Sequence, residues 1–450
     1  MSNTRPAGWM DTMPIPKLVV KCSVPLMVST LVSSLYNLVD SMYVSRISEK
    51  ALTATTVAFP LSLLLFSMSI GLGVGVSSRL SRYLGEGEVE SARQTGWTGL
   101  VLATLSTIPF ILIGMFGMPT LFRFLTSDPE VSRLGQAYSR VILLLCAGQF
   151  LASLGSRLLQ STGQASLSMA TQILGSVLNC ILDPIMIFGW LGCPAMGITG
   201  AALATVISQC VAGGSAVIVY FVKNPAMRLT RKDLAIRLPV VKEIYRVGIP
   251  VMLTMALNSL LMMVINRILE GISTTAIAFY GIYSKLQTFL FMPTNGLSQG
   301  IVPVVGYFYG GKKSDKVRAA AACALKIGIG FSLVGTCVFL LFPGILMAIY
   351  NAGPQLQQIG AVGLRILALT FLPQAVVMVL SNAFTAMGNG MVNMKCSMIK
   401  GILPIPLLLV LVRVFGDSWC WFAFVIADLI AAALAITAYR RQVREVLTRL

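Results

Sequence analysis

Residues 65–75 read LFSMSIGLGVG, and residues 290–300, which lie 225 positions further along the chain, read LFMPTNGLSQG. Leu, Phe, Gly, Leu and Gly recur at the same places in both stretches. The register holds on either side, at Pro25 and Pro250, Met27 and Met252, Gly85 and Gly310, Arg93 and Arg318, and Gly163 and Gly388. A constant register through Gly and Pro positions predicts a chain built from two copies of one structural unit.

The composition places this repeat in a membrane. The 450-residue chain is 56% hydrophobic and 11% charged, with a mean hydropathy of +0.83. Soluble proteins carry about 25% charged residues, so a soluble domain of this composition could not cover its surface with polar groups. These values exclude disorder, a coiled coil, a disulfide scaffold and almost any soluble enzyme, and they leave a polytopic membrane protein.

The absence of one residue type and the scattered positions of another exclude several kinds of metal site and catalytic site. The chain has no histidine, which excludes His-based metal sites, Ser-His-Asp catalysis and imidazole proton relays. Its nine cysteines form no C-x-x-C pair, and we interpret most of them as small buried hydrophobes. We therefore expect no enzymatic activity and no cofactor.

A helix needs about 20 apolar residues to cross a bilayer. We predict an all-α polytopic membrane protein with twelve transmembrane helices in two pseudo-symmetric six-helix lobes. The expected spans are 22–44, 54–78, 97–118, 138–158, 168–189, 201–222, 247–269, 276–300, 320–343, 361–384, 396–414 and 419–439. The expected segments are a cytoplasmic N-terminal segment 1–21, an N-lobe 22–222, a basic cytoplasmic linker 223–246, a C-lobe 247–440 and a cytoplasmic tail 441–450.

The basic residues predict how the chain is oriented. Most Lys and Arg outside the spans lie on the side that holds both tails and the even-numbered connections, which predicts cytoplasmic termini. The net charge of +18 is then a property of the cytoplasmic face, and we expect no nucleic-acid partner. Six spans per repeat give both copies the same orientation, with a cleft between the lobes, as in transporters.

Three acids lie well inside the expected spans: Asp40, Asp183 and Asp428. An acid at that depth costs about 2.5–3.5 kcal/mol on insertion scales and needs a compensating role. Tyr36 and Asn37 lie four and three residues before Asp40, and Asn179 lies four before Asp183, so each carboxyl has an amide on its own helix face. The set predicts either a site for Na⁺ or a shared proton, or a structural polar pair.

The repeat restricts this set to the first half, because positions 265 and 408, which correspond to Asp40 and Asp183, hold Ile and Leu. The acid in the last span, Asp428, shares its lobe with Lys285 and Lys400. These three residues predict either a buried ion pair or a polar site for substrate.

GLGVG at 71–75 fits close helix packing better than a dinucleotide loop. GGKK at 310–313 is not a P-loop, so we expect no ATP site.

Several motifs together carry a resemblance to a known family: LYNLVDSMYVSRI (35–47), SIGLGVGVSSRLSRYLGEGEVESAR (69–93), LQSTGQ (159–164), LNCILDPIMIFG (178–189), MGITGAALATVISQ (196–209) and NGLSQGIVPVVGYFYGGKKSDKVRAA (295–320). Over about residues 17–440 the chain resembles the multidrug and toxic compound extrusion (MATE) transporters, and within them the DinF/MepA-like branch. The resemblance implies the MATE fold, with a cation site formed by Asp40, Asn179, Asp183 and Thr205 and supported by Tyr36.

The resemblance also implies a function. A member of this family exports amphipathic organic, often cationic, drugs in exchange for H⁺ or Na⁺, by alternating access. We expect a multi-pass monomer in a bacterial inner membrane, with small-molecule drugs or toxins and membrane lipid as its partners. The alternative is a flippase for lipids or lipid-linked oligosaccharides of the same superfamily, which Lys285, Arg365 and Lys400 keep open. The sequence does not separate Na⁺ from H⁺.

Overall fold

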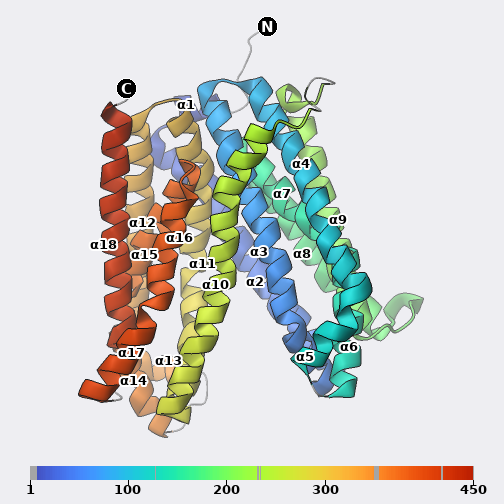
Figure 1. Cartoon of the computed structure of the whole chain (residues 1–450), viewed down its shortest axis with the longest axis vertical. Coiled ribbons are helices and arrows are strands. Elements are labelled where there is room, and N and C mark those ends of the chain that lie inside the picture. Colours follow the sequence, from blue (N-terminus) through green and yellow to red (C-terminus); the bar gives the residue numbers. More distant parts are fainter. Residues whose placement is uncertain are drawn as a thin grey trace. The chain divides into compact units, whose positions relative to one another are not determined.

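The structure is a computed structural model that describes residues 8–126, 128–230, 233, 235–348, 354–416 and 419–448. In these residues the regular elements are all helices (Figure 1). The first half contains α1 (Trp9–Thr12), α2 (Ile15–Ser45), α3 (Glu49–Glu86), α4 (Val89–Leu112), η1 (Ile113–Gly117), α5 (Met118–Leu125), α6 (Pro129–Leu144), α7 (Ala147–Ser161), α8 (Ala165–Phe188), η2 (Trp190–Gly192), α9 (Ile198–Lys223) and η3 (Pro225–Met227). The second half contains α10 (Leu238–Ile272), α11 (Thr274–Gly310), α12 (Ser314–Leu341), α13 (Pro343–Ala348), α14 (Pro354–Ala368), α15 (Phe371–Ala386), α16 (Gly390–Ile402), α17 (Pro404–Phe415) and α18 (Phe422–Thr448).

The helices agree with a membrane protein of the predicted class. Nine helices in the described ranges are long and apolar enough to cross a bilayer, and two bent pairs, α6 with α7 and α14 with α15, raise the number to eleven. The remaining predicted span, 276–300, lies in the 37-residue helix α11, which is not one of these eleven. The all-helical membrane fold is confirmed, and the number of twelve spans stays a prediction.

The sequence repeat is a structural repeat. Helices α3 and α11, α4 and α12, α5 and α13, α6 and α14, and α8 and α16 begin 225 residues apart. The packing partners repeat as well, because α3 packs on α4 and α7 while α11 packs on α12 and α15. The predicted duplication is confirmed at the level of helix boundaries and helix contacts.

The chain divides into two compact units that exchange the beginnings of two helices. Unit 1 comprises residues 1–12 and 28–252, and unit 2 comprises residues 13–27 and 253–450. The first part of α2 therefore belongs to unit 2, and the first part of α10 belongs to unit 1. The helical segment also begins earlier than predicted, because α10 starts at Leu238, inside the expected linker 223–246.

Paired glycines seat these exchanged segments. In unit 1, a Cβ added at Gly71 would lie 2.3 Å from Met252 Cγ, and one at Gly75 would lie 2.3 Å from the Ile244 carbonyl oxygen. In unit 2, a Cβ at Gly296 would lie 2.4 Å from Met27 Cα. The glycines of both opening motifs thus permit close helix contact, which confirms the packing interpretation of GLGVG.

Acidic residues hold the segment between the two halves against unit 1. Glu243 of α10 pairs with Arg79 of α3, at 2.7 Å between Oε2 and Nε. Asp233 is buried, accepts from the Thr230 backbone N–H at 2.8 Å, and lies 3.2 Å from Arg93 Nε. Burial acts to raise the pKa of Asp233, but the Thr230 hydrogen bonds and Arg93 outweigh it, so the pKa is lowered.

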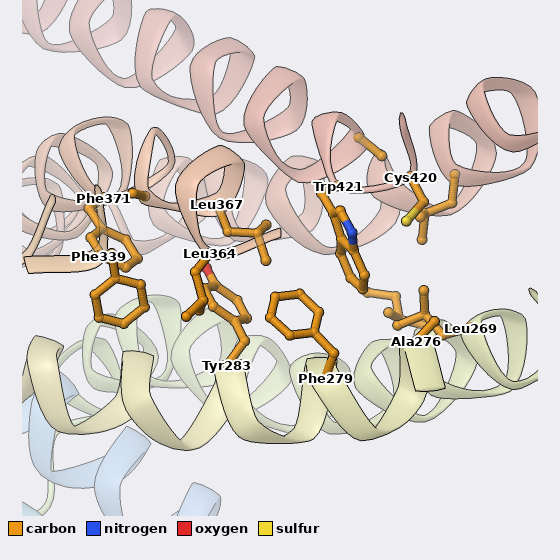
Figure 2. Packing of buried hydrophobic residues seen from close by; sticks show 14 of the residues in the cluster. Leu269, Ala276, Phe279, Tyr283, Phe339, Leu364, Leu367, Phe371, Cys420 and Trp421 are labelled. Carbon is orange, nitrogen blue, oxygen red and sulfur yellow. The ribbon is translucent and has the colours of Figure 1, made fainter. Parts of the chain in front are cut away.

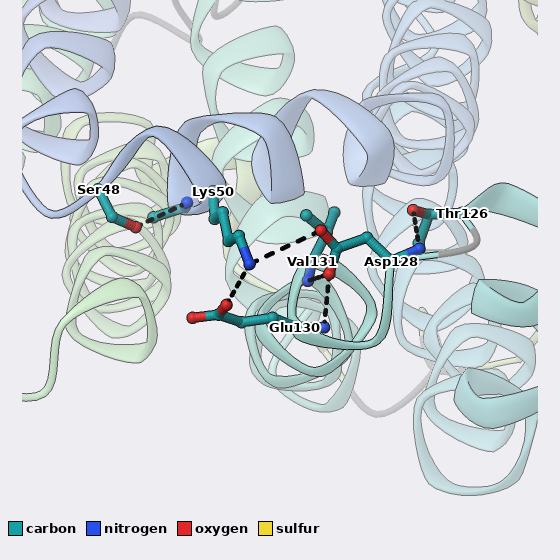
Figure 3. Close-up of polar contacts among 7 residues, drawn as sticks. Ser48, Lys50, Thr126, Asp128, Glu130 and Val131 are labelled. Atoms are coloured by element: carbon teal, nitrogen blue, oxygen red, sulfur yellow. Dashed lines mark hydrogen bonds and ion pairs between the residues drawn. The ribbon is translucent and has the colours of Figure 1, made fainter.

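A second ionic cluster joins the first turns of α3 and α6 in unit 1 (Figure 3). Lys50 of α3 pairs with Glu130, and its Nζ lies 3.8 Å from Asp128 Oδ2. Asp128 also caps α6, because its Oδ1 accepts from the backbone N–H groups of Glu130 and Val131. These two N–H bonds, followed by Lys50, lower the pKa of Asp128. The cluster fixes the helix that carries Tyr138, which is part of the site described below.

Unit 2 has an aromatic core. Phe279 of α11 contacts Trp421 edge to face, with ring centroids 4.7 Å apart, and Phe371 contacts Phe339 at 4.8 Å. Figure 2 shows Phe279 and Tyr283 rising from one helix toward Leu364 and Leu367. The core is therefore built by α11 against the helices of the second half that follow it.

Candidate cation site

The two acids predicted for the site come together in unit 1. Asp40 lies near the end of α2, and Asp183 lies in the last two turns of α8. Their carboxyl groups are within hydrogen-bonding reach of each other. Two carboxyls at that distance cannot both stay ionised without a proton or a cation between them. We interpret the pair as a candidate site for one proton or one cation.

An amide and a hydroxyl complete the site. Asn179, one turn before Asp183 on α8, donates from Nδ2 to Asp183 Oδ1 at 3.3 Å and to Thr205 Oγ1 of α9 at 3.5 Å. Thr205 in turn donates to the Ala201 carbonyl at 3.0 Å. Asn179 and Asp183 are 2% and 0% exposed. All four residues that the resemblance implied thus lie in one connected group.

The helix that carries Asp183 is continuous through the following proline. Pro184 lies inside α8, which runs from Ala165 to Phe188. A proline has no N–H for the carbonyl of the residue four positions earlier, so the Cys180 carbonyl loses its helical donor. The carbonyl oxygen of Cys180, close to Asp183 on α8, is therefore left without a backbone hydrogen-bond donor.

Two tyrosines lie near the carboxyl pair. Tyr36, one turn before Asp40, and Tyr138 of α6 both interact electrostatically with Asp40 and Asp183. Tyr36 was expected there. Tyr138 was not singled out from sequence, since no acid or amide on its own helix face marks it. Its place follows from tertiary packing, because it packs beside Ala54 and Ile187 in a buried cluster of unit 1.

Asn37 does not join the group. Its side chain is exposed, and its Nδ2 donates to the Ser33 carbonyl of its own helix at 2.8 Å. No hydrogen bond in the described residues links Asn37 to Asp40. Helical spacing put Asn37 on the face of Asp40, but the structure directs its amide along α2.

The donor set fits a small hard cation as well as a proton. Asp183 Oδ2 and Asn179 Oδ1 are buried and have no hydrogen-bond partner among the described residues. Carboxylate, amide, hydroxyl and carbonyl oxygens are ligands for hard cations, and a carboxyl pair can equally share one proton. Groups of three or more His, Cys, Asp or Glu that would suit other metals are absent from the described part of the chain.

The three polar residues predicted in the C-lobe lie in unit 2 and form no ion pair with any residue that the structure describes. Asp428 of α18 is buried, Lys400 of α16 is partly buried, and Lys285 of α11 is exposed. Asp428 accepts from Gln374 Nε2 at 2.8 Å, and Lys400 acts on it only through longer-range electrostatics. Within the described residues, the ion-pair interpretation is thus replaced by an amide contact that the sequence did not indicate.

A duplicated all-helical fold with long apolar helices is typical of polytopic membrane transporters that are built from an internal repeat. Comparison with known proteins makes this specific. The MatE family model matches residues 25–185 and again residues 250–410, two segments that are themselves 225 residues apart. The chain belongs to the MatE family.

Similar proteins span almost the whole chain. The multidrug export protein MepA of Staphylococcus aureus is 24% identical over 433 residues, which are 95% of this chain and 94% of MepA. An FAD transporter of Shewanella oneidensis is 24% identical over 399 residues, or 88% of each chain.

Solved structures have the same fold. A multidrug resistance MATE family transporter of the MOP superfamily in an outward-facing conformation gives a TM-score of 0.90 at 24% identity and covers 99% of both chains. A MOP superfamily transporter from Pyrococcus furiosus gives 0.89 at 24% identity, also over 99% of both chains. These structures confirm the predicted fold class.

Proposed function

We propose that the protein is a cation-coupled multidrug efflux antiporter, which exports amphipathic organic cations in exchange for H⁺ or Na⁺ by alternating access. The observation that carries the proposal is the contact between the partly buried Asp40 and the buried Asp183, with oxygens of Asp183 and Asn179 that have no hydrogen-bond partner among the described residues. MepA, a multidrug exporter by name, is similar over nearly the full length. No ATP-binding motif competes with an ion gradient as the energy source.

The proposed cycle uses the charge of the carboxyl pair. An entering cation neutralises the pair and relaxes the repulsion between α2 and α8, so the state without a cation and the state with one differ in helix packing. Coupling requires only that cation and drug prefer different states or compete for the same one. Tyr36, Tyr138 and Thr205 orient the oxygens that accept the cation.

The other assignments follow from this function. The chain acts without catalysis or a resident cofactor, as a monomer in a bacterial inner membrane, with both termini in the cytoplasm and lipid around its spans. Its partners are drugs and toxins, and nucleic acid is not one of them. Fusing a reporter to each end, and labelling from one side of the membrane, tests the orientation.

Efflux from proteoliposomes tests the central proposal. Ethidium is loaded inside, and a Na⁺ gradient or a pH gradient is imposed separately, with wild type and with Asp40→Asn/Asp183→Asn. We expect efflux under one gradient, and its loss in the double variant. Asp315→Asn, which removes an exposed acid from the first turn of α12, is the matched control and should keep full efflux. Full gradient-driven efflux in the double variant would contradict the proposal.

The rival function is a flippase for lipids or lipid-linked oligosaccharides. The FAD transporter among the similar proteins favours keeping this alternative, because its name indicates a substrate that is not a cationic drug. If wild type moves no ethidium under either gradient, the same vesicles with fluorescent lipids decide whether the rival is right.

A further inference from the structure

Unit 2 contains a buried acid that the proposed cation site does not use. Asp428 of α18 is 2% exposed, and its Oδ2 accepts from Gln374 Nε2 of α15 at 2.8 Å. Gln374 Oε1 accepts in turn from Gln287 Nε2 of α11, also at 2.8 Å. Asp428 Oδ1 is buried and has no hydrogen-bond partner in the described residues. Three side chains from three helices thus form one line of hydrogen bonds that ends at Gln287.

The charge of Asp428 fixes the direction of this line. An ionised carboxylate only accepts hydrogen bonds, whereas an amide donates from nitrogen and accepts at oxygen. Gln374 must therefore turn its NH₂ toward Asp428 and its oxygen toward Gln287. Gln287 then turns its NH₂ inward and keeps its own oxygen, Oε1, at the outer, partly buried end.

The groups around Asp428 allow its carboxyl to gain or lose a proton. The charged or titratable groups that interact with it in the described structure are Lys400 of α16 and Tyr280 and Tyr283 of α11. Helix α15 carries no titratable side chain. Lys400 forms no ion pair with Asp428 within 4.0 Å in the described residues, so no cation in contact holds the carboxyl ionised.

Aromatic side chains lie beside Gln374 and Asp428 in the network. Tyr283 hydrogen-bonds Thr370 at 3.3 Å and also contacts Gln374. Tyr280 stacks on Phe424 with ring centroids 5.3 Å apart. Flat apolar faces beside a hydrogen-bonding amide suit an aromatic molecule that carries N–H groups, and ring faces attract positive charge.

We propose that Asp428 sets, through Gln374, which hydrogen-bonding group Gln287 offers to a substrate. With Asp428 ionised, Gln287 Oε1 accepts from the amino N–H groups of an aromatic organic cation. When Asp428 takes up a proton from solvent, its new O–H donates to Gln374 Oε1. Gln374 Nε2 then donates to Gln287 Oε1, and Gln287 presents its NH₂, which repels those N–H groups. The substrate class rests on the proposed function, whereas the relay is independent of the Asp40/Asp183 site.

The other half of the chain offers an internal control. The residue 225 positions before Gln374 is Gln149, which donates to Ser69 Oγ at 3.1 Å. The positions that correspond to Asp428 and Gln287 hold Leu203 and Ser62. Unit 1 therefore has the central amide without the acid, and a change at Gln149 perturbs a similar buried contact without touching a relay.

Ethidium binding to the purified full chain in lipid nanodiscs, followed by fluorescence anisotropy from about pH 5 to about pH 9, tests the relay. The background is Asp40→Asn/Asp183→Asn, which removes the titration of the other site. We expect binding to weaken as the pH falls, and Asp428→Asn to abolish that dependence. Gln287→Leu should weaken binding about tenfold at high pH and little at low pH, while Gln149→Leu keeps the dependence.

Gln374→Leu covers the case in which the Asp428 variant fails to fold, because it interrupts the relay and leaves the acid in place. It should flatten the pH dependence as well. A pH dependence that survives in both relay variants overturns the proposal, and so does an absence of pH-dependent binding in the Asp40→Asn/Asp183→Asn background. If pH-dependent binding is present but wild type shows no gradient-driven efflux, the relay stands and the proposed antiport fails.

Discussion

The same positions in the two units have opposite chemistry. Asp40 and Asp183 of unit 1 correspond, 225 residues on, to Ile265 and Leu408 of unit 2, which are 5% and 0% exposed and belong to one apolar core. Tyr138 corresponds to Gly363, and Ala54 to Phe279. A Cβ at Gly363 would lie 2.5 Å from Phe279 Cε1, so the Phe279 ring occupies the space beside the glycine.

This difference indicates that the repeat determines the arrangement of the helices, whereas the side chains at equivalent positions determine the function of each unit. In unit 1 the small residue Ala54 on α3 and the larger Tyr138 on α6 belong to one packed cluster, and Tyr138 also interacts with the carboxyl pair. In unit 2 the large residue Phe279 on α11 packs against Gly363 on α14. Volume is conserved by exchanging large and small residues between facing helices, while polarity is not.

The largest loss of stability is expected when an acid is introduced into unit 2 at the position equivalent to Asp183. Leu408→Asp buries a carboxyl in an apolar core with no cation or amide prepared for it, which should cost about 5 kcal/mol of stability. We expect little monodisperse protein after extraction and a strongly lowered Tm. Leu408→Met, which keeps the volume, should cost less than about 1.5 kcal/mol. A Leu408→Asp protein as stable as wild type would show that unit 2 still tolerates the site.

The second-largest loss of stability is expected when the Phe279 ring is removed from the core of unit 2. Phe279→Ala removes the edge-to-face contact with Trp421 and leaves a cavity, at a cost of about 3 kcal/mol. Adding Gly363→Tyr restores the arrangement of unit 1, Ala54 with Tyr138, and should recover part of the loss. Thermal unfolding of the two variants measures this. No recovery in the double variant would argue against exchangeable packing of the two halves.

A smaller effect, of opposite sign, is expected when unit 1 is given the chemistry of unit 2. Asp40→Ile with Asp183→Leu replaces a buried polar pair by apolar groups, which should leave stability unchanged or raise it by about 1 kcal/mol. Gradient-driven efflux should be lost. Unfolding temperature and efflux, measured on one preparation, check both. A large loss of stability would mean that the pair is structural.

The smallest effect concerns the exchanged helix segments. Glu243 and Arg79 in unit 1 correspond to Leu18 and Val304 in unit 2, so an ion pair stands where the repeat has two buried apolar side chains. Because the pair is partly exposed, Glu243→Gln should cost no more than about 1 kcal/mol, and the cost should shrink at high salt. Tm values of wild type and variant at low and high salt measure it. A difference independent of salt would contradict the assignment.

Much of this organisation could be predicted from sequence. The repeat, the helical membrane fold and the grouping of Asp40 with Asp183 follow from local spacing and from the family motifs. Tyr138 and the Gln287–Gln374–Asp428 line could not be predicted, because they depend on contacts between helices far apart in the chain. The exchange of helix beginnings at Met27 and Met252 was missed for the same reason, since apolar spacing along one helix does not say which unit it packs against.

Asn37 shows the limit of helix-face reasoning. Its spacing from Asp40 is right for a shared face, but an amide can also bond a carbonyl of its own helix, as it does at Ser33. Asn179 lies four residues before Asp183, also on a shared face, and does contact it. The two differ in burial, which the spacing alone does not give.

The central claim is that one cation is held by the carboxyl pair of unit 1 and is exchanged for drug. The most direct test is to add a saturating cationic drug to purified wild type in weak buffer and measure the H⁺ or Na⁺ released. The account predicts release from wild type and from Asp428→Asn, and none from Asp40→Asn/Asp183→Asn. Equal release from the double variant would contradict it.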